Sequence, residues 1–178
     1  ADQIIVTDHP YNILNDPLKD SLNIPEWIIN FLREKFLDLK EFDSKIKMNL
    51  PKKIFINRKD GRSHRFITNE NEVEETLLNE GFKSVKLSDY SFKEQIMLFK
   101  NANFIVGLHG AGFANTIFCD SDTKIIELKS TTAGDAIKNI CINNNLRYKS
   151  ISSENKKFNW NNQYGDIEID TKILKSLL

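Results

Sequence analysis

A glycine-rich turn at residues 107–112 carries the clearest chemical signal of this 178-residue sequence. The apolar run Phe104-Ile-Val106 breaks into Gly-Leu-His-Gly-Ala-Gly before a helical pattern begins, which predicts a strand, a tight turn and a helix start. The first backbone N–H groups of a helix lack partners within it and favour an anion. Because Gly110 and Gly112 have no Cβ to keep a ligand away, a phosphate would fit here. The alternative is a plain turn in which the glycines serve geometry alone.

A second candidate feature is a basic loop that follows a short β-rich segment, residues 53–57. The loop carries Arg58, Arg62, His64 and Arg65. Ligands of open parallel sheets bind outside the carboxyl ends of the strands, and planar guanidinium groups match phosphate oxygens better than a lysine does. We therefore expect a diphosphate to lie between this loop and the glycine turn. A solvated surface loop is the alternative.

His109 and Glu127 are two further candidates. His109, inside the glycine turn, can donate to a phosphate oxygen, act as an acid or base, or cap the turn through its ring nitrogens. Glu127 interrupts the apolar segment 125–128, where a carboxylate is unexpected unless it meets a partner. A ribose diol would supply two hydroxyl donors. The alternative is an edge-strand carboxylate that faces water.

Several familiar motifs are missing from the sequence. The glycines run G-x-x-G-x-G, which is neither the dinucleotide fingerprint nor the Walker P-loop, so classical NAD and ATP chemistry are disfavoured. Asp120-Ser-Asp122 matches a metal-binding D-x-D, but it lies between a predicted helix and a predicted strand, where these residues are ordinary turn formers. No G-x-S-x-G elbow supplies a hydrolase nucleophile. We expect no metal and no cofactor.

The composition restricts the partners and the compartment. The 25 basic and 25 acidic side chains balance, which argues against nucleic acid or an anionic membrane as partner. No apolar run is long enough to cross a bilayer, and the first residues lack the layout of a signal peptide. Cys119 and Cys141 have apolar neighbours, so we expect buried free thiols and a reducing compartment. The expected location is the cytoplasm, or the inner face of the membrane.

The elements that position these residues alternate along the chain. An amphipathic helix is expected from Pro25, with an inward stripe of Ile28, Phe31, Leu32, Phe36 and Leu39. Thereafter we expect strands at 53–57, 82–87, 103–107, 124–128 and 146–151, and helices at about 69–81, 91–101, 111–118, 135–144 and 170–178.

Capping signals mark two of these helices. Asn69 with Glu72, and Ser91 with Glu94, have the spacing of capping boxes, and Gly81 has the position of a left-handed C-cap. Parallel strands joined by helices require crossover connections. The sequence therefore predicts a Rossmann-like, doubly wound parallel sheet with helices on both faces at 51–178, after a lead-in and linking helix at 1–50.

The ordered series of motifs resembles the glycosyltransferase family 61 domain over about residues 50–150. The resemblance rests on Ile56-Asn-Arg58, Arg65-Phe-Ile-Thr-Asn-Glu70, Ser91-Phe-Lys-Glu-Gln95, Ala102-Asn-Phe-Ile-Val-Gly-Leu-His-Gly-Ala-Gly112 with Asn115, and Lys124-Ile-Ile-Glu-Leu128. That family includes bacterial capsular polysaccharide enzymes, plant xylosyl- and arabinosyltransferases and animal O-linked N-acetylglucosaminyltransferases. The resemblance implies a GT-B enzyme that uses a nucleotide sugar, with UDP as the expected nucleotide, inverts the anomeric centre and needs no divalent metal.

The resemblance also implies roles for individual residues. His109 and Arg58 would be catalytic and Glu127 would face the nucleoside, while a larger set would bind the donor diphosphate: Arg58, Arg62, Arg65, His109, Gly110, Ala111, Gly112 and Asn115. The acceptor would be a glycan or polysaccharide. In GT-B enzymes the general base commonly belongs to an N-terminal, acceptor-side domain. We expect this chain to hold the donor-side domain and a linking helix, and the acceptor-side domain to be missing from it.

Two other functions fit the same residues. One is a binding or regulatory module that keeps the nucleotide pocket without catalysing transfer. The other is a Rossmann-like interaction domain whose glycine turn is only architectural. Binding of UDP separates the second from the others, and glycosyl transfer separates the first.

Overall fold

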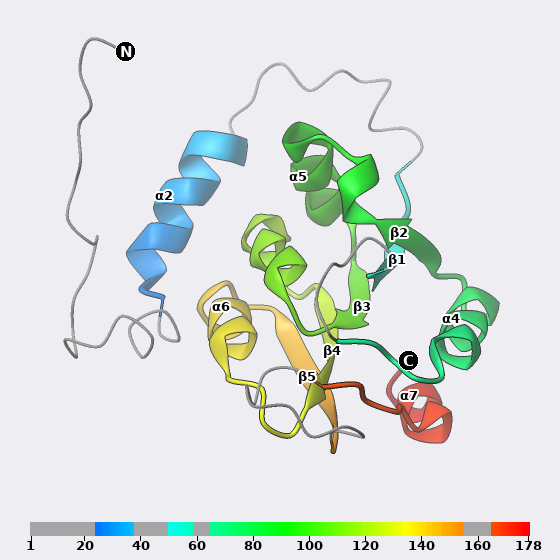
Figure 1. The fold of residues 1–178 in the computed structure, drawn as a ribbon. Helices are drawn as coiled ribbons and strands as arrows, with labels where there is room; N and C mark the ends of the chain where they lie inside the picture. The colour runs from blue at the N-terminus through cyan, green and yellow to red at the C-terminus, as the bar shows by residue number, and fades with distance from the viewer. Residues whose placement is uncertain (1–23, 38–49, 59–64, 155–164) are drawn as a thin grey trace, which may run out of the picture.

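The computed structural model describes residues 24–37, 50–58, 65–154 and 165–178, and within these ranges five strands form one parallel sheet (Figure 1). The strands are β1 (Lys53–Asn57), β2 (Lys83–Lys86), β3 (Phe104–Leu108), β4 (Lys124–Ser130) and β5 (Arg147–Ser153). All four neighbouring pairs run parallel, in the order β2-β1-β3-β4-β5. The predicted α/β, Rossmann-like fold is confirmed, with each strand within a few residues of its expected position.

Helices cover both faces of the sheet. Successive side chains of a strand point to opposite faces, and those of β1, β3 and β4 are buried on both. One face packs against α2 (Glu26–Leu37), α5 (Phe92–Asn101), the 3₁₀ helix η2 (Ala111–Phe118) and α6 (Ala136–Asn143). The other packs against α4 (Glu70–Asn79) and α7 (Thr171–Leu177). Neighbouring residues of β3 show the division, since Ile105 belongs to the first core and Val106 to the second, both fully buried.

The strand order creates a switch point between β1 and β3. The connection that leaves β1 leads to α4 on one face, whereas the connection that leaves β3 leads to η2 on the other. The two connections therefore diverge at the carboxyl ends of adjacent strands. In open α/β sheets this divergence opens the crevice in which ligands bind.

Two of the three predicted helix caps are confirmed. Ser91 and Glu94 form both bonds of a capping box at α5. Beyond α4, Gly81 has φ +82°, and the amides of residues 81 and 82 donate to the carbonyls of Leu78 and Leu77. This is the Schellman arrangement that the sequence predicted.

The predicted capping box at Asn69 is wrong. The Asn69 side chain makes no capping bond to α4. Its amide instead donates to the carbonyl of Ile169 at 2.8 Å, and its oxygen accepts from the Ile169 amide at 3.0 Å. The Asn69 side chain therefore bonds a segment one hundred residues further along the chain and does not cap α4.

The packed face of helix α2 matches the expected stripe only in part, because Leu32 and Phe36 pack against the first core as predicted but Phe31 does not. Ile29 is fully buried, whereas Phe31 is 50% exposed. Nearly every residue of this helix except its charged ones is apolar, so spacing alone allowed more than one stripe. Packing against η2 and α6 selects the face that holds Ile29, Leu32 and Phe36.

Some expectations fall on residues that the structure does not describe. Leu39, Arg62, His64 and most of the expected lead-in, residues 1–23, lie outside the described ranges. Where residues are described, no helix has the length and apolar character needed to cross a membrane. Cys119 and Cys141 are buried free thiols, as predicted.

Replacing Gly81 by alanine should lower the free energy of unfolding by about 1 kcal/mol. A Cβ at this position would meet no heavy atom within 4 Å, so the cost comes from the left-handed backbone alone. Urea unfolding followed by circular dichroism measures the change. Gly81→Asn is the matched control and should lose less, because asparagine tolerates this backbone region. An alanine variant as stable as the parent would contradict the assignment.

Candidate functional site

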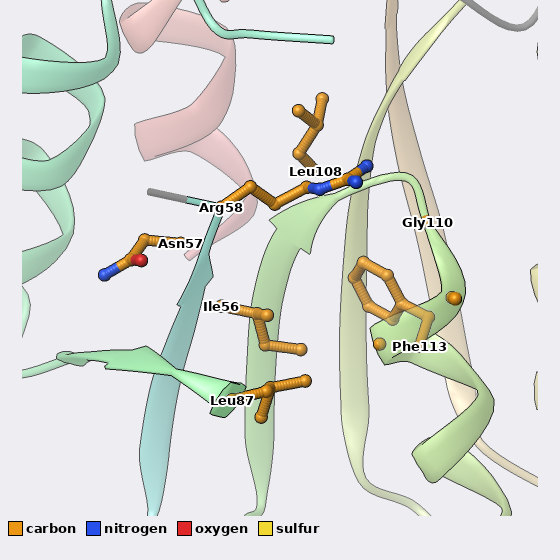
Figure 2. Close-up of a pocket in the computed structure, with 9 residues that line it drawn as sticks. Ile56, Asn57, Arg58, Leu87, Leu108, Gly110 and Phe113 are labelled. Carbon is orange, nitrogen blue, oxygen red and sulfur yellow. The ribbon is translucent and has the colours of Figure 1, made fainter. Parts of the chain in front are cut away.

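A cavity of about 170 Å³ lies at the switch point, where β1 and β3 end (Figure 2). The end of β1, the short 3₁₀ helix η1 (Leu87–Asp89) and the glycine turn form its walls. Its lining residues are Ile56, Asn57, Arg58, Leu87, Leu108, Gly110, Ala111, Gly112 and Phe113. Apart from Arg58 and Asn57 the side chains are apolar, so a charged guest here would meet the guanidinium group and the turn's backbone.

A second cavity, of about 220 Å³, adjoins the first. It is lined by Phe55, Ile56, Arg58, Arg65, Phe66, Ile67, Glu70 and Leu108. Ile56, Arg58 and Leu108 line both cavities. Figure 2 shows the Arg58 side chain reaching from the end of β1 toward the turn.

The structure brings Arg58 and Arg65 together at the glycine turn. Each donates from Nη1 to the carbonyl oxygen of His109 at 3.2 Å. A guanidinium group has five N–H donors, and the bond to this carbonyl uses one of them in each arginine. The expected meeting of the basic loop and the glycine turn is therefore present for these two arginines. Arg62 lies in the undescribed part of that loop.

The chain's last segment holds Arg65 in place. The carbonyl of the next residue, Phe66, accepts from the amide of Ile167 at 2.9 Å, and its amide donates to the Asp166 carboxylate at 3.2 Å. The amide of Thr68 donates to the Ile167 carbonyl at 2.8 Å. Residues 66–68 thereby gain a strand-like partner, which fixes the direction in which Arg65 leaves the backbone.

Close contacts explain the glycines of the turn. A Cβ on Gly110 would lie 2.8 Å from Nη1 of Arg58, and one on Gly112 would lie 2.7 Å from Cδ1 of Leu87. Gly110 has an extended backbone, φ 164°, which any residue can adopt. Its lack of a side chain therefore matters for the room given to the guanidinium and not for the backbone conformation.

The element after the turn is a 3₁₀ helix, where an ordinary helix was expected. Its first ladder bond runs from the amide of Phe113 to the carbonyl of Gly110 at 3.0 Å. Side chains from elsewhere bond its carbonyls: Asn144 donates to Thr116 and Ile117, and Arg33 also donates to Ile117. These carbonyls belong to the last turn of η2, where a helix no longer supplies amides for all of its carbonyls, so the side chains help to satisfy its C-terminal end. The amides of Ala111 and Gly112 precede the ladder and lie at the wall of the first cavity.

The ring of His109 does not line either cavity. Its Nδ1 makes a short hydrogen bond with Oε1 of Glu127, and the Tyr148 hydroxyl donates to Oε2 of the same carboxylate. Glu127 is fully buried on β4, between β3 and β5, so the alternative of an edge carboxylate facing water is wrong. Both of its oxygens are engaged within the protein, and its expected contact with a nucleoside stays a prediction.

Asn115 lies away from the lining of the first cavity. Its amide donates to Oε1 of Gln95 at 2.9 Å, and Gln95 donates in turn to the carbonyls of Leu87 and Tyr90. Asn115 thus supports the turn that carries Leu87 into the cavity wall. Its expected contact with a diphosphate also stays a prediction.

Sequence reasoning missed several residues of the site. Leu87, Phe113 and Glu70 line the cavities, and Tyr148 is a partner of Glu127. Only Tyr148 had a usable signal: the strand expected at 146–151 follows the one that holds Glu127, and a buried tyrosine hydroxyl usually finds a partner. Across the described residues, no three His, Cys, Asp or Glu lie together in a way that could hold a metal ion.

Comparison with known proteins assigns the family. A model described as Glycosyltransferase 61 matches residues 8–126, which is more than half of the chain. The chain therefore belongs to glycosyltransferase family 61, and this membership supports a glycosyltransferase role. No curated protein matches the chain. The matched segment includes Arg58, Arg65 and the glycine turn, and ends one residue before Glu127.

Replacing Gly107 and Gly110 by alanine, one at a time, should destabilise the protein to different extents, because Gly107 lies in the packed core and Gly110 lies beside a cavity. A Cβ on Gly107 would lie 3.0 Å from Cβ of Ile56 and 3.3 Å from Cε2 of Phe113, both in the packed core. We expect Gly107→Ala to lower the free energy of unfolding by about 1–3 kcal/mol. Gly110→Ala meets only the movable end of Arg58, so its effect should stay within about 0.5 kcal/mol.

Urea unfolding of the two variants, followed by tryptophan fluorescence and by circular dichroism, makes the comparison. If both variants lost the same free energy of unfolding, the turn at Gly110 would be as tightly packed as the strand at Gly107. That result would contradict the contacts described above.

Proposed function

We propose that this member of glycosyltransferase family 61 binds the diphosphate of a nucleotide sugar at the glycine turn and transfers the sugar to a glycan acceptor. The observation that carries the proposal is the convergence of Arg58 and Arg65 on the His109 carbonyl. Arg58 lines both cavities at the switch point of the sheet, the first together with the residues that begin η2 and the second together with Arg65. Guanidinium groups and helix-start amides are the groups that suit phosphate oxygens.

The proposed chemistry is electrostatic. When the bond from the sugar to the diphosphate breaks, negative charge develops on the departing phosphate oxygens. Donors that already point at this position stabilise the charge without reorganising during the reaction. Arg58 and Arg65 would act in this way together with the amides of Ala111 and Gly112. We propose that these groups serve where a divalent cation serves in other enzymes, so that transfer proceeds without a metal.

The remaining features of the proposal follow the family resemblance. We propose UDP as the nucleotide, inversion at the anomeric carbon, and a GT-B arrangement in which a further N-terminal domain binds the acceptor. Inversion requires a base that deprotonates the acceptor hydroxyl, and we assign this base to the acceptor side. The biological setting we propose is synthesis of cell-surface polysaccharide or glycan, from the cytoplasm or the inner face of the membrane.

Two measurements separate this proposal from its alternatives. Calorimetric titration with UDP tests binding, and release of UDP from UDP-sugars in the presence of glycan acceptors tests transfer. Binding without transfer would favour a nucleotide-binding module. Absence of UDP binding would leave the glycine turn with an architectural role. We expect the affinity for UDP to be the same in the presence of EDTA and in the presence of magnesium. An affinity that depends on the cation would contradict the proposal that no metal takes part.

Arg58→Ala and Arg65→Ala should each weaken UDP binding about 10- to 100-fold, which corresponds to the loss of roughly 1.5–3 kcal/mol for hydrogen bonds to a charged group. Arg147→Ala is the matched control. Arg147 begins β5 at the opposite end of the sheet, where its Nε donates to Asp122 at 3.1 Å. This variant should bind UDP as the parent does. An equal loss in all three variants would point to a general charge effect and not to a site.

Gly110→Val should abolish UDP binding while the protein stays folded. The extended backbone at residue 110 accepts valine, but its Cβ would meet the Arg58 guanidinium at 2.8 Å and its methyl groups would enter the cavity. Calorimetry with UDP and a thermal melt together test this prediction. Unchanged affinity in a folded variant would show that no ligand occupies this side of the turn.

A further inference from the structure

Three polar side chains lie in a row beneath the glycine turn and line neither cavity of the candidate site. They are His109 at the end of β3, Glu127 on β4 and Tyr148 on β5, and we call them the His109 anchor. Only 11% of the His109 side chain and none of the Glu127 side chain is exposed. Burial of a carboxylate is costly unless it is paired and hydrogen-bonded, so the position of Glu127 requires both of its partners.

The direction of these hydrogen bonds follows from chemistry. Burial raises the pKa of the Tyr148 hydroxyl above its ordinary value, and the hydrogen bond to Glu127 raises it further. The hydroxyl therefore stays protonated and donates to Oε2. The other carboxylate oxygen accepts as well, which requires a proton on Nδ1 of His109. The carboxylate thereby fixes both the tautomer and the orientation of the ring.

The backbone of His109 is held by the same neighbouring strand. Its amide donates to the carbonyl of Leu128 at 2.8 Å, which extends the pairing of β3 with β4 one residue into the turn. Side chain and main chain of His109 are thus both tied to β4. The carbonyl of His109 is the oxygen to which Arg58 and Arg65 donate, so its position depends on these two attachments.

We propose that Glu127 and Tyr148 are positioning residues, which hold His109 so that its carbonyl aims Arg58 and Arg65 at the diphosphate. The inference rests on the proposed function, since it assumes that the two arginines bind the donor. In this inference Glu127 supports His109, whereas a contact with the nucleoside was expected from the sequence. The role of His109 is performed by its backbone carbonyl, which orients the two arginines.

A comparison of ligands distinguishes the two parts of Glu127. If Glu127 acts through the arginines, Glu127→Gln weakens inorganic pyrophosphate and UDP alike. We expect about a 10-fold loss for both, the lower end of the loss seen when the orienting partner of a metal-bound histidine is removed. If Glu127 contacts the nucleoside, UDP and uridine bind more weakly while pyrophosphate is unaffected. This second outcome would overturn the inference.

A conservative variant guards against misfolding. Tyr148→Phe removes one hydroxyl and keeps the ring, and it should weaken pyrophosphate in the same direction as Glu127→Gln, by a smaller factor. Tyr90→Phe is the matched control, because Tyr90 lies outside the anchor, and it should leave affinity unchanged. Thermal melts establish that each variant is folded. Folded Tyr148→Phe and Glu127→Gln proteins with the parent's pyrophosphate affinity would overturn the inference.

A double-mutant cycle tests the route through the arginines. In an Arg58→Ala, Arg65→Ala background, Glu127→Gln should change pyrophosphate affinity by less than about 2-fold, since the groups it positions are gone. A full, additive loss in that background would show that Glu127 acts by some other path and would overturn the inference.

Nitrogen NMR of the histidine rings gives a readout that does not depend on ligand binding. The chain has three histidines, and the signals of His109 are those that disappear in His109→Gln. We expect a protonated Nδ1 in the parent protein and altered ring shifts in Glu127→Gln. An unprotonated Nδ1 would overturn the anchor. A protonated Nδ1 in a protein that binds neither pyrophosphate nor UDP would instead overturn the proposed function, and with it the purpose given to the anchor.

Discussion

The candidate site depends on one carbonyl oxygen that two guanidinium groups share. Arg58 and Arg65 both donate to the carbonyl of His109, although bringing two positive charges to one acceptor costs Coulomb repulsion. An anion placed beside the pair reduces that repulsion and gains two sets of donors. In the function proposed above, the donor diphosphate is that anion and this arrangement receives it. Its geometry is set before the guest arrives, which is the condition under which electrostatic stabilisation is most effective.

The topology of the sheet explains why these groups meet. Arg58 directly follows β1 and the glycine turn directly follows β3, and these strands are neighbours. Their connections diverge to opposite faces, and the two cavities lie where these strands end. Gly110 then lets the guanidinium lie against the turn. The strand order brings Arg58 next to the glycine turn, and the missing Cβ of Gly110 leaves room for its guanidinium.

Sequence reasoning succeeded where short-range chemistry decides the structure. The strands follow from short apolar segments, and the caps at Gly81 and Ser91 follow from residues within a few positions of one another. Reasoning failed where a distant partner competes for a local group. Ile169 takes the side chain of Asn69 from the start of α4.

The same distinction applies to the site. Arg58, Arg65 and the glycine turn were predicted to meet because the carboxyl ends of parallel strands lie at one edge. The inward turn of the His109 ring was not foreseen, since it depends on where Glu127 and Tyr148 lie on neighbouring strands. Tyr148 pairs in register with Ile125, yet its hydroxyl reaches the carboxylate of Glu127 two residues further along β4. Such a diagonal contact follows from side-chain length and packing, which residue spacing does not encode.

The two arginines reach the shared carbonyl by different routes, and this difference shows how much of the chain the site requires. Arg58 continues directly from a central strand, whereas Arg65 precedes residues 66–68, which pair with residues 166–167. Glu127 and Tyr148, beneath the carbonyl, come from β4 and β5. The segment that matches the family ends at residue 126, so it contains the groups that face the cavities but not all of the groups that hold them. Preorganisation of the site depends in part on the chain beyond that residue, because Arg65 and the His109 carbonyl are held by contacts with β4, β5 and the final segment.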